Sequence, residues 1–329
     1  MKGIFAAGSA NVGDELNEWL LPALLGDIQR DKVAVLGIGT LLNTHFCRRL
    51  EDAGQIMVLG TGAGYGAPPA LDQRWHFHAV RGRRTARMLG LAADRAVADA
   101  AYLLASLDWR RSAHRHGEVV VVPHHRSLRY LDWQHVCERA GVRFLSPLLP
   151  AGEFMQVLAG ARLVLSEAMH GAILADIARV PWQGFGFGGQ FNLDKWLDWA
   201  EMFELDLDIH PLPGFYDPAR FSEGRPLRYH LAKVLKVHAS RVGLGREKWK
   251  RMTLPAFRLE QAQARLVRQL KALAQQPGML SSDDLLRLRV DQLYQRVEQL
   301  RAQLQAPAGR RLEGDGIAFL RNVMVPGTA

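Results

Sequence analysis

The stretch LVLSEAMHGAILAD, residues 163–176, decides which fold class the sequence favours. Its first three residues are apolar, the pair Ser166-Glu167 is polar, and His170 opens a pattern typical of a buried helix. A strand too apolar to alternate, followed directly by a helix, is typical of a parallel sheet buried on both faces. Ligands of such sheets collect beyond the carboxyl ends of the strands, where this polar turn lies.

The same strand–turn–helix unit recurs on both sides of this stretch. A helix over residues 153–158 precedes it, and the helix within it ends near Arg179, before Pro181. The sequence therefore predicts an α/β fold with two Rossmann-like domains facing each other across a cleft, the arrangement called GT-B. Further strands are predicted at residues 2–7, 33–37, 56–59, 76–80, 118–122 and 142–145.

A polar and basic segment near residues 105–117 separates the two predicted domains. Apolar residues near the C-terminus follow a heptad pattern at positions 286, 290, 293, 297, 300 and 304. This pattern predicts a helical hairpin or short coiled coil, a homodimer contact through residues 256–305, or a helix packed on its own domain. We assign 1–110 to an N-terminal α/β domain, 111–252 to a second α/β domain, 253–305 to these helices and 306–329 to a flexible tail.

The amino-acid composition limits the cellular compartment and the kinds of partner that we expect. Of the 329 residues, 48% are hydrophobic and 23% charged, as in an ordinary soluble globular protein. No apolar run is long enough to span a bilayer, and the N-terminus reaches Gly8 too early for a signal peptide, so we expect a cytoplasmic protein. The formal charge of +9 fits an anionic partner, although an Arg-rich composition can also reflect a GC-rich genome. We expect no nucleic-acid partner, because no recognition motif accompanies the charge.

The turn around His170 is the strongest candidate for a functional site. The first amides of a helix attract anions, so a histidine there can bind phosphate or transfer a proton. Glu167 at the strand end can act as an acid or base, or orient a sugar hydroxyl. The structural alternative is that Ser166 caps the helix and His170 is only packed.

Two further segments carry side chains suited to ligands. Residues 81–85, RGRRT, follow a predicted strand, and their guanidinium groups suit bidentate binding of a carboxylate or phosphate; the alternative is a solvated basic turn. Near the N-terminus, Gly13 lets the backbone come close to a ligand, and Asp14 either binds sugar hydroxyls or caps a helix.

Other motifs narrow the chemistry. His124 can help to bind phosphate, but adjacent histidines point apart on an extended chain, so we expect no metal site at His124 and His125. The glycine-rich run over residues 60–66 lacks the Lys-Ser/Thr ending of a P-loop. Cys47 and Cys137 are expected to be ordinary thiols.

Taken in order, these segments resemble the polysaccharide pyruvyl transferase family over about residues 3–200. Ala168 stands where more distant members carry an arginine expected to touch phosphoenolpyruvate, so Arg81, Arg83 or Arg84 has to supply that charge. The similar motifs are Asn-x-Gly-Asp-x-Leu at 11–16, Arg-Gly-x-x-Thr at 81–85 with Leu-Gly at 89–90, Asp-Ala-Ala at 99–101 in place of Asp-Pro-Ala, Pro-His at 123–124, Ser-Glu-x-x-His-Gly at 166–171, Ala-Asp at 175–176, Arg-x-Pro-Trp at 179–182, and Lys-Trp with Asp-Trp at 195–199.

The resemblance implies transfer of the enolpyruvyl unit of phosphoenolpyruvate onto a hexose as a pyruvate ketal, with release of phosphate and without a metal or other cofactor. The implied acceptor is an exopolysaccharide or its lipid-linked precursor, which would bring the enzyme to the inner face of the membrane, where basic charge favours anionic lipid. The implied catalytic residues are His170, Glu167 and Asp14. The implied donor ligands are Arg81, Arg84, Thr85, His124, Ser166 and Gly171. The implied acceptor ligands are Asn11, Gly13, Lys195 and Trp199, although core packing is the commoner use of tryptophan.

Two other functions stay open on the sequence. A GT-B glycosyltransferase that uses a nucleotide sugar would bind UDP or GDP tightly. A non-catalytic polysaccharide-assembly protein would bind no donor and would offer its C-terminal helices to a partner.

Overall fold

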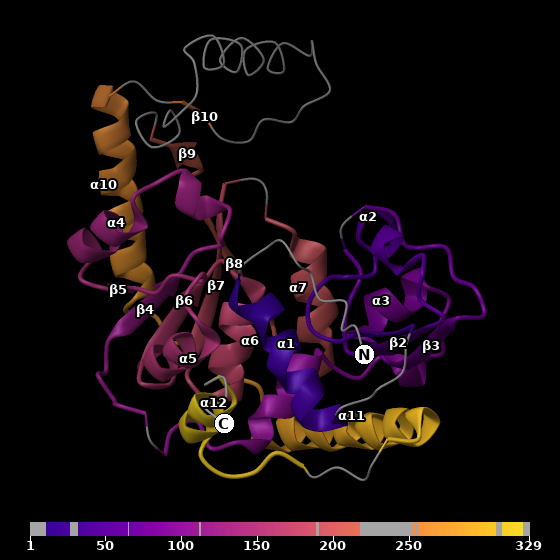
Figure 1. Ribbon diagram of the computed structural model, residues 1–329. Coiled ribbons are helices and arrows are strands. Elements are labelled where there is room, and N and C mark those ends of the chain that lie inside the picture. Colours follow the sequence, from indigo (N-terminus) through magenta and orange to yellow (C-terminus); the bar gives the residue numbers. More distant parts are fainter. Residues whose placement is uncertain are drawn as a thin grey trace, which may run out of the picture.

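The computed structural model describes residues 11–26, 32–64, 66–111, 113–188, 191–217, 252–253, 256–306 and 311–324. Within these residues the fold is α/β, and the strands of the two larger sheets pair in parallel. Figure 1 shows the larger sheet on the left and the smaller on the right. The strand predicted at residues 2–7 lies outside the described residues.

The smaller sheet has three strands in the order of the chain. Their positions agree within one residue with the strands predicted at 33–37, 56–59 and 76–80. The strands are β1 (Val33–Leu36), β2 (Gln55–Leu59) and β3 (Trp75–Ala79). The helices of this part are α1 (Val12–Leu25), α2 (Thr44–Cys47), η1 (Arg48–Leu50), α3 (Arg83–Met88), η2 (Ala93–Arg95) and η3 (Ala100–Ser106).

The larger sheet has five strands, and its order differs from the order of the chain. It runs β5 (Arg143–Phe144), β4 (Val119–Val122), β6 (Leu163–Ser166), β7 (Trp182–Phe187) and β8 (Ile209–Leu212). The helices of this part are η4 (Ser127–Arg129), α4 (Trp133–Ala140), α5 (Ala151–Ala159), α6 (Met169–Ile177), α7 (Leu193–Ala200) and η5 (Glu201–Phe203). A short parallel pair joins β9 (Phe215–Tyr216) to β10 (Met252–Thr253).

Strand β4 shows why the apolar runs form a sheet covered on both faces. Successive side chains of a strand point to opposite faces. Val120 and Val122 belong to one buried core, whereas Val119 and Val121 belong to another. Because both faces of β4 are buried, its sequence needs no polar alternation, and the expected double-sided burial is confirmed.

The C-terminal helices do not form the predicted hairpin. Helix α10 (Ala256–Leu273) packs on α4, whereas α11 (Asp283–Leu304) packs on η3, β2, β3 and α1, and Figure 1 shows the two helices on different sides of the chain. The heptad residues of α11 are buried in the core of the same chain, which is the third of the predicted alternatives. A heptad pattern identifies a buried stripe without saying what covers it, which is why the hairpin was predicted.

Part of the segment predicted as a flexible tail is helical. Helix α12 (Gly316–Met324) packs on α5, and a Cβ at Gly316 would collide with the ring of Trp109. Among the described residues, no helix combines the length and the apolar character that crossing a membrane would require.

Candidate functional site

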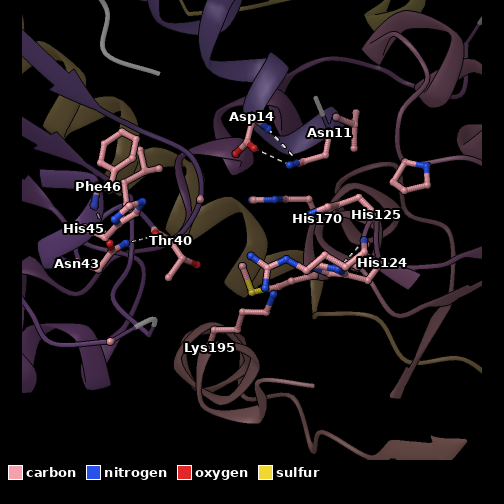
Figure 2. A pocket seen from close by; sticks show the side chains of 18 of the residues that line it. Asn11, Asp14, Thr40, Asn43, His45, Phe46, His124, His125, His170 and Lys195 are labelled. Atoms are coloured by element: carbon pink, nitrogen blue, oxygen red, sulfur yellow. Dashed lines mark hydrogen bonds between the residues drawn. The ribbon is translucent and has the colours of Figure 1, made fainter. Parts of the chain in front are cut away.

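A pocket of about 570 Å³ lies where the predicted ligand site was expected, beyond the carboxyl ends of β1, β4 and β6. Its wall comes from loops of both sheets, from the first residues of α1 and α6, and from α7 (Figure 2). Five of the predicted site residues line it: Asn11, Asp14, His124, His170 and Lys195. The other lining residues that matter below are Thr40, Arg49, His125 and Arg126.

The start of α1 presents a carboxylate to this pocket. Asn11 is the N-cap, and its Oδ1 accepts hydrogen bonds from the backbone N–H of Gly13 at 3.1 Å and of Asp14 at 3.3 Å. Its Nδ2 donates to Oδ2 of Asp14 at 2.5 Å. Asn11 is therefore the capping residue, and Asp14, which was considered for that role, is held over the pocket instead (Figure 2).

His170 lies in the first turn of α6 and closes the pocket below Asp14. Its Nε2 points away toward Asp99, whose Oδ2 is 3.6 Å distant. Ser166 does not cap α6, because the N-cap is Ala168 and the Ser166 hydroxyl donates to the Ala168 carbonyl at 2.7 Å. A Cβ at Gly171 would collide with Oγ of Ser166, so these two residues, predicted as donor ligands, serve close packing behind the pocket.

Glu167 supports the loop after β4. Its carboxylate accepts the backbone N–H of His124 at 2.8 Å and the hydroxyl of Ser127 at 2.9 Å. It is 5% exposed and is not among the described lining residues. Glu167 thus positions His124, which does line the pocket, whereas the sequence predicted a direct acid or base.

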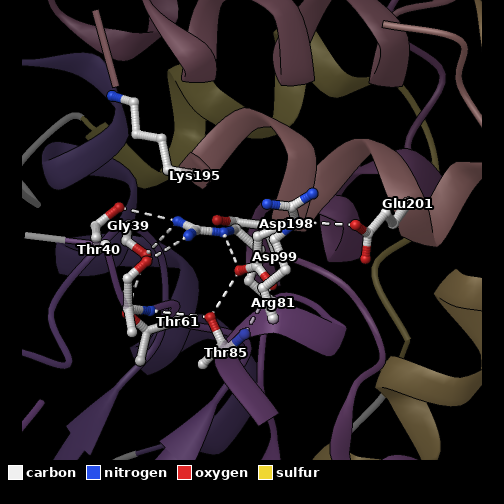
Figure 3. Close-up of polar contacts among 12 residues, drawn as sticks. Gly39, Thr40, Thr61, Arg81, Thr85, Asp99, Lys195, Asp198 and Glu201 are labelled. Atoms are coloured by element: carbon white, nitrogen blue, oxygen red, sulfur yellow. Dashed lines mark hydrogen bonds and ion pairs between the residues drawn. The ribbon is translucent and has the colours of Figure 1, made fainter. Parts of the chain in front are cut away.

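The Arg-Gly-x-x-Thr motif forms a buried interaction with helix α7 (Figure 3). Arg81 is fully buried, and its Nε donates to Oδ2 of Asp198 at 3.0 Å. The rest of its guanidinium donates to the hydroxyl of Thr40 at 2.9 Å and to the carbonyl of Ala63 at 2.8 Å. Thr85 donates to the same Asp198 carboxylate through its N–H at 2.9 Å and its hydroxyl at 2.6 Å.

None of the residues predicted in this motif as donor ligands appears among the described lining residues. Arg84 extends to Glu201 at 2.8 Å and Asp194 at 3.3 Å. A Cβ at Gly82 would collide with the backbone of Asp198, so the glycine permits close approach of α7. The motif therefore joins α3 to α7, which differs from the predicted clamp on a substrate carboxylate.

The tryptophan predicted to contact the acceptor belongs to the core. Trp199 is fully buried, stacks near Trp182 with ring centroids 5.1 Å apart, and donates its indole N–H to the hydroxyl of Tyr102 at 3.0 Å. The packing alternative is confirmed for this residue. Lys195, one turn earlier, reaches the pocket.

Two of the three cations among the described lining residues, Arg126 and Arg49, were missed by the sequence-based prediction. Arg126 follows His124 and His125 in the turn after β4, and Arg49 comes from η1. Burial, followed by the nearby charges of Arg126 and Lys195, lowers the pKa of His125 to about 4. This wall therefore carries a neutral imidazole beside two cations at neutral pH. The position of Arg126 in the turn that follows a buried strand was the available sequence clue.

Among the described lining residues, the formal charges are three cations and one carboxylate: Arg49, Arg126, Lys195 and Asp14. Such a wall suits a small polyanion next to a polar group. Within the described ranges, no group of three or more His, Cys, Asp or Glu side chains is arranged to hold a metal ion.

Comparison with known proteins shows a similarity to a curated protein. The succinoglycan biosynthesis protein ExoV of Rhizobium meliloti (strain 1021) is 33% identical over 195 residues, which cover 58% of this chain and 61% of that protein. The chain resembles the polysaccharide pyruvyl transferase family. The match spans less than two thirds of the length of this relative. No protein-family profile and no solved structure matches the chain.

Proposed function

We propose that this protein transfers the enolpyruvyl unit of phosphoenolpyruvate onto a sugar of an exopolysaccharide, or onto its lipid-linked precursor, as a pyruvate ketal. The relative named above takes part in the synthesis of succinoglycan, an exopolysaccharide. The observation that carries the proposal is the juxtaposition of His170 and Asp14 with Arg49, Arg126 and Lys195 around one pocket. We further propose that the two sheets belong to two domains of the GT-B type, because loops of both sheets line this pocket.

The donor carries a phosphate and a carboxylate, and the basic wall can accommodate both. Arg126 offers a planar fork of N–H groups for one anionic group, and Lys195 a point charge for the other. Arg49, the middle residue of η1, also lines the pocket. In this proposal Arg126 supplies the charge for which the resemblance left Arg81, Arg83 or Arg84. The guanidinium groups of Arg81 and Arg84 bind carboxylates of α7 and η5 instead.

Ketal formation needs a proton donor and a proton acceptor on the two sides of the reacting carbon. His170 protonates the methylene carbon of the donor, and a sugar hydroxyl attacks the central carbon while Asp14 takes its proton. A second hydroxyl of the same sugar then attacks that carbon, the bond from carbon to the phosphate oxygen breaks, and the second proton leaves on the phosphate. Asn11, which holds Asp14 at 2.5 Å, orients the acceptor side.

The acceptor and the location follow from the same proposal. A lipid-linked sugar lies at the cytoplasmic face of the membrane, and a chain of net charge +9 favours contact with anionic lipid there. Thr40 and Asn43 add polar groups to the pocket wall for sugar hydroxyls.

The proposal is tested by thermal unfolding with phosphoenolpyruvate, UDP, GDP or buffer alone. A ligand that binds the native state raises the apparent unfolding temperature. A rise with phosphoenolpyruvate alone is expected. A rise with a nucleotide alone would favour the glycosyltransferase, and no rise with any ligand would count against a donor site in the free protein.

A pair of variants tests which arginine binds the donor. Arg126→Ala is expected to raise the KM for phosphoenolpyruvate about 10- to 100-fold, the effect of losing hydrogen bonds between charged groups. Arg84→Ala is the matched control and is expected to leave KM unchanged, because its side chain lies outside the described pocket wall. The opposite pattern would restore the assignment made from the sequence motif.

A further inference from the structure

A buried carboxylate faces the side of His170 that is turned away from the pocket. Asp99 is 0% exposed, and its Oδ2 lies 3.6 Å from Nε2 of His170, whose side chain is 13% exposed. The two residues are 71 positions apart in the chain and come from the start of η3 and the start of α6. Only the fold brings them together.

Among the residues that the structure describes, neither of the two facing atoms has another partner. Among the described residues, Oδ2 of Asp99 and Nε2 of His170 are buried and make no hydrogen bond. Buried polar atoms are nearly always hydrogen-bonded, so an unsatisfied pair calls for a reason. At 3.6 Å the atoms are within ion-pair distance and slightly beyond hydrogen-bond length, and hydrogen bonds of catalytic groups often tighten only when substrate binds.

Asp99 is held rigidly in this orientation. Its Oδ1 accepts the backbone N–H of Ala101 at 3.1 Å as the N-cap of η3. The loop after β2 packs closely on the start of η3, since a Cβ at Gly60 would collide with the backbone of Ala100. One carboxylate oxygen is thus fixed by the fold, and the other is left directed at the imidazole.

The other ring nitrogen, Nδ1, lies at the start of α1 beside the pocket. Gly13 at the start of α1 lies against Nδ1, and a Cβ there would collide with that nitrogen. His170 lines the pocket although its Nε2 is buried, so Nδ1 is the ring nitrogen on the pocket side. Figure 2 shows the ring beneath Asp14 in the pocket wall.

Asp176, a second buried carboxylate, has a purely structural role that differs from that of Asp99. Asp176 of α6 accepts the N–H of Ser281 at 2.8 Å and the hydroxyls of Ser281 and Tyr102 at 2.7 and 2.9 Å. Both of its oxygens are satisfied by groups that hold α6 to its neighbours. Asp99 has an imidazole in front of Oδ2 instead.

We infer that Asp99 is a positioning residue: it orients the His170 ring and keeps a proton on Nε2, so that Nδ1 faces the reacting groups. The inference rests on the proposed function for what His170 does, but the pairing itself is a property of the free protein. In the transferase, Nδ1 of the doubly protonated ring then delivers its proton to the methylene carbon of the donor, which leaves the neutral ring with its proton on Nε2, where Asp99 accepts it.

Asp99→Asn is the variant that separates orientation from folding. The side chain keeps its shape, and its oxygen can still cap η3, but its amide then faces Nε2 and donates to it. The neutral ring then carries its one proton on Nδ1, and it cannot deliver this proton because Nε2 no longer holds a second one. We expect kcat to fall at least about 100-fold, with the KM for phosphoenolpyruvate within about threefold and the unfolding temperature unchanged or higher. A kcat within about threefold of wild type would overturn the inference.

A double-variant cycle provides the second test. If Asp99 acts through His170, then Asp99→Asn causes no further loss of kcat in the His170→Ala background. If the two losses multiply, Asp99 has a separate structural role and the inference is wrong.

A spectroscopic readout keeps this test independent of the reaction. The ¹⁵N chemical shifts of the His170 ring, assigned with His170→Gln, report which nitrogen carries the proton in the free protein. We expect Nε2 in the wild type and Nδ1 in Asp99→Asn. If Asp99→Asn moves the ring proton but the protein does not bind phosphoenolpyruvate, the pairing of Asp99 with His170 stands and the proposed function is rejected. If the wild type and Asp99→Asn have the same tautomer, the pairing is rejected.

Discussion

Removing the carboxylate of Asp198 is expected to destabilise the protein strongly. This carboxylate is 2% exposed and accepts three hydrogen bonds, from Nε of Arg81 and from the N–H and hydroxyl of Thr85. In Asp198→Ala the fully buried guanidinium of Arg81 loses its ion-pair partner, and the Thr85 N–H loses its acceptor. A buried charge without its partner is much less favourable than the intact pair.

The magnitude follows from these contacts. Breaking a buried ion pair by removing one partner costs about 3–5 kcal/mol. The orphaned N–H of Thr85 adds to this, whereas the remaining bonds from Arg81 to Thr40 and Ala63 reduce it. We therefore expect the free energy of unfolding to fall by about 3–5 kcal/mol, which moves the urea midpoint by about 1 M for a chain of this size.

Equilibrium urea unfolding, followed by circular dichroism, measures this change. The matched control is Asp194→Ala, one turn earlier on α7, where the carboxylate is 82% exposed and 3.3 Å from Arg84. Exposed ion pairs contribute little, so the control is expected within about 0.5 kcal/mol of wild type. If the two variants differed by less than about 1 kcal/mol, the account of a buried interlock between α3 and α7 would be refuted.

Two further predictions concern the pocket and the smaller sheet. The first is that Gly13→Ala keeps the protein folded, because alanine suits the start of α1. The added Cβ would displace the ring of His170, so kcat is expected to fall at least about tenfold. A normal kcat would show that Gly13 does not confine the ring. The second concerns His78, whose pKa is lowered to about 4 by burial. Below about pH 6.5 this histidine is protonated in the unfolded chain, whereas in the folded chain it stays neutral down to about pH 4. The free energy of unfolding of the wild type is therefore expected to fall by about 2–3 kcal/mol between pH 7 and pH 4.5, and that of His78→Gln to fall measurably less. Urea unfolding at the two pH values measures both changes, and equal losses would contradict the assignment.

The strands were predictable from the sequence because burial on both faces leaves a direct mark. The four valines of β4 need no polar partner, and the polar pair Ser166-Glu167 marks the end of β6. Local patterns of this kind depend on neighbours in the chain.

The roles of charged residues were harder to predict, because their partners are remote in the sequence. Arg81 meets Asp198 across 117 residues, and nothing in the local turn distinguishes a buried guanidinium from a ligand. The same holds for Asp99, which the sequence showed only as part of a motif and which the fold places beside His170. Conversely, Asn11, Asp14 and His170, which were predicted as site residues, do line the pocket, since helix starts beside strand ends are local features.

The position of α11 sets the order in which the chain can mature on the ribosome. The strands of the smaller sheet end at Ala79, but the helix that covers β2, β3 and η3 begins at Asp283, about 200 residues later. At ordinary rates of synthesis that interval lasts roughly 10–40 s. Throughout it, the apolar surface that α11 later covers is exposed to water, which favours aggregation of the nascent N-terminal half. A chain interrupted before Asp283 is left with a core that no later segment can close.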